Sequence, residues 1–222
     1  MKAACIIVAA GKGTRLGAGT PKAFVKLNGI RLFEHSLRAY QASPSIAAIV
    51  LVVPPGLLPG LAPLFERYPK LTAIVPGGGQ RQDSVRNGLA ACPPGADVVL
   101  IHDAARPLVA ARDIGRVVAA TRRYGAAILA APVTDTIKLV NGPVVARTLD
   151  RRLLWRAQTP QGFSRAVLAK SHSSTPARSA TDDSMLAERI GVKVRIVPDT
   201  GGNIKVTTPH DLEVAAWLLK RR

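Results

Sequence analysis

Residues 9–27, AAGKGTRLGAGTPKAFVKL, combine four glycines with four basic side chains and contain no acidic residue. The segment directly follows a short apolar run, and its glycines would let the backbone approach a ligand closely and present N–H groups to oxyanions. Arg15 and Lys22 add two cations beside that backbone. Leu16 rules out a dinucleotide fingerprint, and no Gly-Lys-Ser/Thr closes the segment as in a P-loop. The segment predicts a polyphosphate site, with a plain turn as the alternative.

A second glycine-rich segment, 76–92, reads PGGGQRQDSVRNGLAAC. Its triple glycine leads into a predicted helix, and Ser84 falls near the first turn of that helix. One interpretation is close backbone packing against a flat ligand such as a base or a ribose. The other is a flexible turn followed by an ordinary helix cap.

The apolar segment 98–101 ends in His102 and Asp103. A carboxylate near a polyphosphate is repulsive unless a divalent cation lies between them, and Mg²⁺ is commonly held by one or two carboxylates together with substrate phosphates. Asp103 is therefore a candidate magnesium ligand. Alternatively, it caps a turn or pairs with Arg106. His102 is expected to be packed or hydrogen-bonded.

Three further segments, 132–138, 149–163 and 201–212, are polar without being of low complexity. They offer candidate ligands for anions or hydroxyl groups, namely Thr136, Arg151, Thr159 and Lys205. Taken singly, each has the character of an ordinary surface residue. Only as a set do they indicate a binding site.

Short apolar runs alternate with amphipathic segments along the whole chain, which is typical of repeated βαβ units. Strands are predicted at 3–9, 46–53, 71–75, 97–101, 126–131 and 191–198, and helices at 31–42, 80–91, 110–124, 163–171, 182–190 and 209–221. The expected fold is a Rossmann-like, doubly wound α/β fold with a mostly parallel sheet, and ligands of such sheets bind beyond the carboxyl ends of the strands. Residues 132–150, with Asn141-Gly142 at the centre, predict a β-hairpin, either a plain surface feature or an arm that pairs with a second subunit.

The 222 residues are 47% hydrophobic, which is enough for one domain over 1–222, and no apolar run reaches the roughly 18 residues of a membrane span. The net charge of +17 favours anionic ligands. The basic residues are scattered, however, and the few aromatic residues form no stacking platform, so nucleic acid is not expected as the partner. Cys5 and Cys92 form neither a metal motif nor a disulfide framework, which favours the cytoplasm.

Seven segments occur in the order found in the 2-C-methyl-D-erythritol 4-phosphate cytidylyltransferase family, which the chain resembles over residues 4 to about 217. They are AAGKGTRLGAGTPKAF, GGGQRQDSVRNGL, LIHDAARPL, PVTDTIK, TLDRRLLWRAQTPQGF, ATDDSML and NIKVTTPHDL. The first is shared by nucleotidyltransferases in general, whereas HDAARP, TPQGF and NIKVT point to this family. The resemblance implies Mg²⁺-dependent transfer of CMP from CTP to the sugar-alcohol phosphate, and a homodimer with interlocking hairpin arms.

The resemblance also implies roles for single residues. Arg15 and Lys22 would stabilise charge on the transferring α-phosphate, while Arg151 and Lys205 would hold the acceptor phosphate; Asp103 would bind the metal. The residues expected around the nucleotide are Ala9, Ala10, Gly11, Gly13, Gly78, Ser84 and Asp103. Those expected at the acceptor are Arg106, Thr136, Arg151, Thr159, Thr181 and Lys205, some of them reaching across from the partner subunit.

The sequence departs from the family pattern at three positions. Ala23 stands where a glutamine is usual, Gly79 replaces a residue that is often polar, and Gly202 stands where an acidic residue can occur. The last departure puts a second protein carboxylate on the metal in doubt. Two other functions stay open: cytidylyl transfer to another polyol phosphate such as ribitol 5-phosphate, and non-catalytic binding of nucleotides or RNA.

Overall fold

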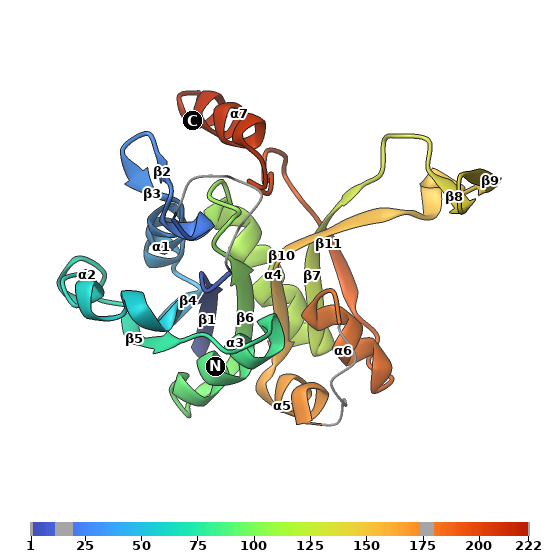
Figure 1. Ribbon diagram of the computed structural model, residues 1–222. Coiled ribbons are helices and arrows are strands. Elements are labelled where there is room, and N and C mark those ends of the chain that lie inside the picture. Colours follow the sequence, from blue (N-terminus) through green and yellow to red (C-terminus); the bar gives the residue numbers. More distant parts are fainter. Residues whose placement is uncertain (1, 12–19, 174–179, 222) are drawn as a thin grey trace.

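The computed structural model describes residues 2–11, 20–173 and 180–221 of the chain (Figure 1). Two of the predicted site residues, Gly13 and Arg15, lie outside these ranges.

A seven-stranded sheet forms the centre of the molecule, with the order β11-β7-β10-β6-β1-β4-β5. Its strands are β1 (Lys2–Val8), β4 (Ile46–Val53), β5 (Leu71–Pro76), β6 (Ala96–Asp103), β7 (Ala126–Pro132), β10 (Trp155–Ser164) and β11 (Arg195–Pro198). Every strand runs in the same direction except β10, which is antiparallel to both of its neighbours. The predicted α/β fold with a mostly parallel sheet is confirmed.

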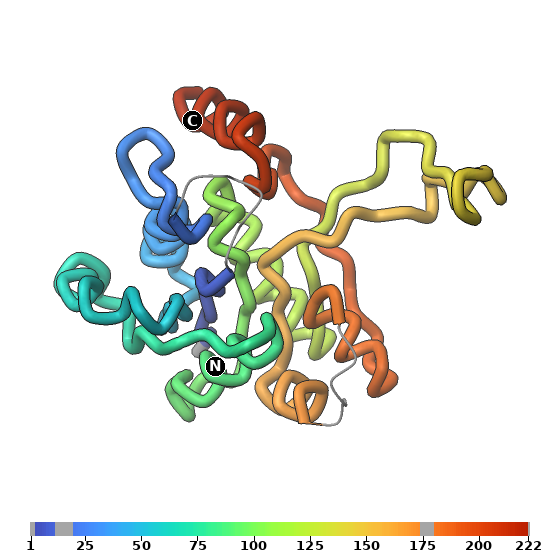
Figure 2. Tube along the Cα trace, in the orientation of Figure 1, coloured from blue at the N-terminus to red at the C-terminus, as the bar shows by residue number. Residues whose placement is uncertain are grey.

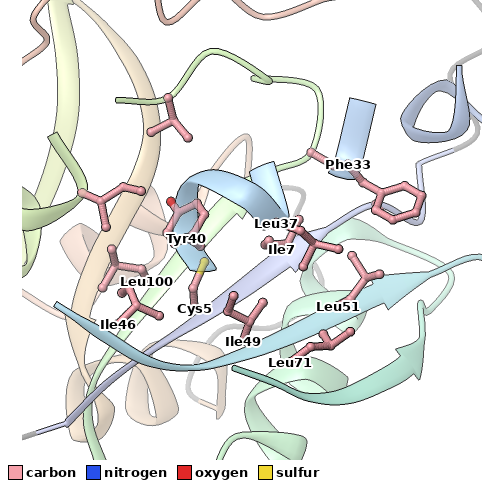
Figure 3. Close-up of a cluster of buried hydrophobic side chains, with 14 of the residues drawn as sticks. Cys5, Ile7, Phe33, Leu37, Tyr40, Ile46, Ile49, Leu51, Leu71 and Leu100 are labelled. Atoms are coloured by element: carbon pink, nitrogen blue, oxygen red, sulfur yellow. The ribbon is translucent and has the colours of Figure 1, made fainter. Parts of the chain in front are cut away.

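Helices cover both faces of this sheet (Figure 1). Helices α1 (Leu32–Ala42) and α4 (Ala111–Tyr124) pack on one face, whereas α3 (Arg81–Ala91), α5 (Arg165–Ser173) and α6 (Asp183–Arg189) pack on the other. The alternation of side chains along a strand feeds both layers. Cys5 and Ile7 of β1 join the core under α1 and α4, which Figure 3 shows, and Ile6 joins the core under α3. Two buried apolar layers therefore fix the strand ends that carry the site.

A smaller unit packs beside the sheet and contains η2 (Lys22–Phe24), the two-stranded pair β2 (Lys26–Leu27) and β3 (Ile30–Arg31), and the last helix, α7 (Pro209–Leu219). Leu27, Val206 and Ala215 share a third apolar cluster that joins these pieces. The remaining short helices are η3 (Pro55–Leu57), η4 (Pro59–Leu61), α2 (Leu64–Arg67) and η5 (Arg151–Leu153). Ile204 and Val206, on either side of Lys205, both pack in the third cluster, which holds the backbone of Lys205 in place.

The predicted hairpin is confirmed as β8 (Lys138–Asn141) and β9 (Val144–Thr148), which project from the body of the molecule (Figure 1). Asn141 pairs with Val144, so the connecting loop consists of Gly142, whose φ is +57°, and Pro143. Its two legs run side by side in Figure 2, joined by a hydrogen bond from the Val133 N–H to the Leu154 carbonyl (3.0 Å). We call residues 133–154 the arm.

Strand β10 is the main element that the sequence analysis did not predict. Its segment was expected to be a polar stretch followed by a helix from residue 163, but it forms a strand in the interior of the sheet, and the helix begins at Arg165. The polar side chains are buried because each finds a partner. Gln161 accepts hydrogen bonds from the backbone of Asp183 and Ser184, and Gln158 accepts one from Asn203. Strand periodicity alone does not identify such a segment, since its buried face is not apolar.

Candidate active site

The strand order reverses between β1 and β6, because β4 and β5 lie on one side of this pair and β10, β7 and β11 on the other. Ligands of open α/β sheets bind at the carboxyl ends of the strands at such a switch point. A cavity of about 430 Å³ lies there. Its lining consists of Val8, Ala9, Ala10, Gly11, Lys22, Ala23, Gly78, Gly79, Gln80, Arg81, Ser84, Asp103, Ala104, Ala105 and Lys205. We call it the main cavity.

Two backbone segments form one wall of the main cavity. A Cβ atom on Gly77 would overlap with the Cβ of Ala10, so the loop after β5 can lie against the end of β1 only because residue 77 is glycine. The Gly78 N–H donates to Oγ of Ser84 at 3.1 Å, and that hydroxyl donates in turn to the Gln80 carbonyl at 3.3 Å. The Ser84 side chain therefore shapes the glycine loop from within the first turn of α3.

Asp103, at the carboxyl end of β6, is held by two cations. Its Oδ2 accepts a hydrogen bond from Nζ of Lys205 at 2.6 Å, and its Oδ1 accepts from Nη2 of Arg81 at 3.2 Å. Burial alone would raise the pKa of Asp103, but Arg81 and Lys205 outweigh it and hold that pKa well below its usual range. The carboxyl group is thus ionised, as a metal ligand must be.

A second cavity, of about 210 Å³, adjoins the first and shares Arg81, Asp103 and Lys205 with it. The rest of its lining is Arg106, Ala157, Gln158, Thr159, Gln161, Thr181 and Asp182. Arg106 spans this region by donating to the Asn203 carbonyl (2.8 Å) and the Ala157 carbonyl (3.3 Å). Four of the predicted acceptor contacts, Arg106, Thr159, Thr181 and Lys205, thus line one cavity, which we call the second cavity.

His102 is fully buried and hydrogen-bonded, as predicted. Its Nε2 lies 3.2 Å from the Arg106 carbonyl, its Nδ1 lies 3.1 Å from Oγ1 of Thr159, and its ring packs against Tyr40. Burial lowers the pKa of His102 to about 4, so the ring is neutral, with Nε2 donating to the carbonyl and Nδ1 accepting from the hydroxyl. Oγ1 of Thr159 also accepts from the Asp103 N–H at 3.0 Å. His102 therefore orients Thr159 rather than facing either cavity.

The predicted site residues divide into three groups in the structure. Ala9, Ala10, Gly11, Lys22, Gly78, Ser84, Asp103 and Lys205 line the main cavity, and Arg106, Thr159 and Thr181 line the second. Within the described part of the chain, neither cavity is lined by Thr136 or Arg151. Both are exposed residues of the arm, where Nη1 of Arg151 donates to the Thr134 carbonyl at 2.7 Å.

The sequence analysis missed Arg81, which lines both cavities, and the residues that hold it in place. Burial would lower the pKa of Arg81, but Asp183 and Asp103 outweigh burial and raise it. Its position directly after the glycine loop, at the start of a helix, was the available signal. Gln161, Asn203 and Asp183 gave less warning, because their importance depends on partners far away in the sequence.

The residues present fit one magnesium ion held largely by its substrate. Across residues 2–11, 20–173 and 180–221, no cluster of three or more His, Cys, Asp or Glu side chains could hold a metal by itself. A single ionised carboxylate beside a glycine-lined cavity suits Mg²⁺, which uses one or two carboxylates together with phosphate oxygens. Asp103 is that carboxylate.

A glycine-lined cavity at a switch point, with lysine and arginine side chains around one carboxylate, together with a family match over nearly the whole chain, identifies the chain as a nucleotidyltransferase of the α/β class. The family model described as 2-C-methyl-D-erythritol 4-phosphate cytidylyltransferase matches residues 3–221. The chain belongs to this family.

Similar proteins agree with the family assignment. The 2-C-methyl-D-erythritol 4-phosphate cytidylyltransferase of Pelotomaculum thermopropionicum is 44% identical over the whole chain and 95% of its own length. The bifunctional enzyme IspD/IspF of Desulfotalea psychrophila is 42% identical over 99% of this chain, which spans 57% of that protein. The crystal structure of 2-C-methyl-D-erythritol 4-phosphate cytidylyltransferase from Thermus thermophilus superposes with a TM-score of 0.82, at 34% identity over 99% of this chain and 100% of that one.

Among the described residues, no helix combines the length and the apolar character that crossing a membrane would require.

Proposed function

We propose that the chain transfers CMP from CTP to 2-C-methyl-D-erythritol 4-phosphate, with release of pyrophosphate and with Mg²⁺ as the cofactor. The observation that carries this proposal is the pair of adjoining cavities that share Asp103, Lys205 and Arg81. One cavity is large enough for the nucleotide, and the other offers hydroxyl and guanidinium groups to a polyol phosphate. The shared residues lie where the two substrates would meet.

The reaction is an attack by an oxygen of the acceptor phosphate on the α-phosphorus of CTP. A new oxygen–phosphorus bond forms while the bond to the β-phosphate bridging oxygen breaks, and pyrophosphate leaves with that electron pair. The second pKa of a phosphate monoester lies near 6, so the attacking oxygen is already deprotonated at neutral pH and needs no general base. This accords with a site that offers lysine and arginine side chains, and with a neutral, buried His102 that lines neither cavity.

The energetic problem is then the repulsion between two anionic reactants. Lys22 and Lys205 line the main cavity and would stabilise the negative charge that develops around the α-phosphorus. Arg15 joins them by family resemblance. Asp103 would hold Mg²⁺, which when bound neutralises charge on the triphosphate. Ala9, Ala10, Gly11, Gly13 and Gly78 would surround the nucleotide, mostly through backbone contacts.

The exposed apolar side chains of the arm are the reason for proposing a homodimer. Its exposed apolar side chains include Leu139, Val140, Val144 and Val145, the third of which is 65% exposed. Because Thr136 and Arg151 lie on the arm, we propose that they serve the acceptor site of the partner subunit. We further propose that residues 1–222 act as one catalytic domain in the cytoplasm. The two free, buried cysteines accord with this compartment, because its thiols are kept reduced.

The test is an assay of pyrophosphate release by the purified chain with CTP and Mg²⁺. We expect turnover with 2-C-methyl-D-erythritol 4-phosphate and at least about tenfold lower kcat/KM with ribitol 5-phosphate, since that acceptor lacks the branching methyl group and has one more hydroxylated carbon to accommodate. Equal or better turnover of ribitol 5-phosphate would reassign the acceptor. Tight binding of RNA that weakens with salt, without turnover of CTP, would overturn the enzymatic proposal.

A further inference from the structure

Asp183 is a fully buried carboxylate in the first turn of α6, and the described lining of the two cavities does not include it. Its Oδ2 accepts a hydrogen bond from Nη1 of Arg81 at 2.6 Å, and its Oδ1 lies 3.0 Å from Nε2 of His172. The Asp183 N–H donates to Gln161 of β10 at 3.1 Å. The carboxylate is thus held by two side chains, and the backbone of the same residue by a third.

Arg81 connects the buried Asp183 to Asp103 in the active site. While Nη1 contacts Asp183, the opposite edge of the same guanidinium, Nε and Nη2, contacts Oδ1 of Asp103 at 3.4 and 3.2 Å. A planar guanidinium with directed donors can bridge two carboxylates in this way, whereas a lysine ammonium group cannot reproduce the fork. Asp183 of α6 is therefore linked to Asp103 of β6 through one rigid side chain.

The charges of the two carboxylates and of the lysine and arginine paired directly with them balance, and Arg106 adds a further positive charge near Asp103. Asp103 and Asp183 contribute two negative charges, and Arg81 and Lys205 contribute two positive ones. Without the carboxylate of Asp183, the full charge of Arg81 would face Asp103 alone. Asp103 would then be paired with an excess of positive charge, which disfavours binding of a divalent cation at the same oxygen atoms.

We propose that Asp183 is a positioning residue that holds and neutralises Arg81, so that Asp103 keeps its place and its charge for the magnesium–CTP complex. This inference rests on the proposed function. According to this inference, a residue outside both cavities determines how strongly Mg²⁺ tightens the binding of CTP. Groups that hydrogen-bond to a metal ligand and orient it, without contacting the metal, typically change metal affinity about 10- to 100-fold.

The test compares the affinity for CTP in excess Mg²⁺ with the affinity in EDTA, measured by calorimetry on the full chain. In the wild type, we expect Mg²⁺ to tighten CTP binding. In Asp183→Asn, which preserves the size of the side chain, we expect the ratio of the two affinities to fall about tenfold or more. The Mg²⁺ concentration for half-maximal turnover should rise, and the KM for the acceptor should change little.

The matched control is Glu34→Gln. Glu34 is another buried carboxylate held by arginines, Arg31 and Arg67, but it lies at a separate surface of the molecule. We expect this variant to lose stability without changing the affinity ratio. If Asp183→Asn does not fold, Arg81→Lys decides, because it keeps the charge but cannot bridge both carboxylates; the same fall in the ratio is expected.

A folded variant with the wild-type ratio would overturn the inference, as would a wild type whose CTP affinity is the same in Mg²⁺ and in EDTA. Failure of the proposed function would look different, since the wild type itself would release no pyrophosphate from CTP and the acceptor.

Discussion

Lys205 and Asp103 are 102 positions apart in the sequence, and their side chains meet with Nζ 2.6 Å from Oδ2. The backbone reinforces this contact, because the Val206 N–H donates to the Ala105 carbonyl at 2.8 Å. Lys205 is thereby held at the junction of the main and second cavities, next to the carboxylate proposed to bind the metal.

We predict that Lys205→Ala lowers kcat/KM by about 10²- to 10³-fold, because one preorganised cation is lost from the transition state. Pyrophosphate release would measure the effect. Lys220→Ala, which removes an exposed lysine at the end of α7, should leave turnover unchanged. Activity of Lys205→Ala within about twofold of the wild type would remove Lys205 from the proposed machinery.

Lys22→Ala is predicted to separate catalysis from binding. Lys22 lines the main cavity at the start of η2, where it would act on charge that develops only during the reaction. We expect kcat to fall about 10²-fold while the Kd for CTP changes by less than about threefold. Single-turnover kinetics and calorimetry measure the two quantities. Lys26→Ala, an exposed neighbour, is the control. A weaker Kd for CTP with an unchanged kcat would mean that Lys22 binds the ground state.

Val144→Asp is predicted to convert the proposed homodimer into monomers and to reduce turnover. A charge in the exposed apolar face of the arm would have to be buried in the interface, at a cost of several kcal/mol. Light scattering after size-exclusion chromatography gives the mass. The matched control is Phe65→Asp, which changes an exposed apolar residue of α2. A wild type that is monomeric at micromolar concentration would contradict the role of the arm.

Gly77→Ala is predicted to weaken CTP binding and to cost about 1–3 kcal/mol of stability, because the new methyl group would overlap with Ala10 and push the two wall segments apart. Thermal unfolding and CTP titration test both effects. Gly95→Ala is the control, since nothing lies within 4 Å of a Cβ atom there. Normal CTP affinity in a folded Gly77→Ala variant would show that the wall does not contact the nucleotide.

Asp211 should make the stability of the protein dependent on pH below about 4. Its Oδ2 accepts hydrogen bonds from the Thr207 hydroxyl (2.6 Å) and from the backbone N–H groups of Thr207 and Thr208 (both 2.8 Å). The hydrogen bond from the Thr207 side chain is the largest cause that lowers the pKa of Asp211 to about 2. Because the folded pKa lies below the unfolded value, the stabilisation is complete above about pH 4 and is lost as the pH falls through 2.

We therefore expect the free energy of unfolding of Asp211→Asn at pH 7 to be about 1 kcal/mol lower than that of the wild type. This difference should shrink between pH 4 and pH 2. Urea unfolding at several pH values measures it. Asp97→Asn, at an exposed position of β6, should match the wild type. A difference that stays constant down to pH 2 would disprove the assignment.

The parallel strands and their helices could be predicted because the spacing of apolar residues along each segment indicates its type. The hairpin could be predicted from Asn141-Gly142, which favours a tight turn. About half of the residues that line the two cavities were also predicted, partly from glycine loops and cations after strands and partly from the family resemblance. Strand β10 was missed because Gln158 and Gln161 are buried only through partners supplied by distant segments.

The same reason explains why Arg81 was missed. A single arginine after a glycine loop has no special meaning until the fold brings Asp103 and Asp183 to opposite edges of its guanidinium. Conversely, Thr136 and Arg151 were predicted as site residues, yet they lie on the arm and line neither cavity, so we propose that they act in the site of a second subunit.

Pro132 and Trp155 are direct register partners at the point where β7 ends and β10 begins. The chain therefore leaves the sheet and returns to it at one place, with the whole arm as an excursion between two paired residues. The length and composition of that excursion can change without shifting any strand register. If two copies pair through their arms as proposed, changes within the arm would alter that pairing, and replacing the arm by a tight turn would abolish it, while the strands that carry the site keep their register.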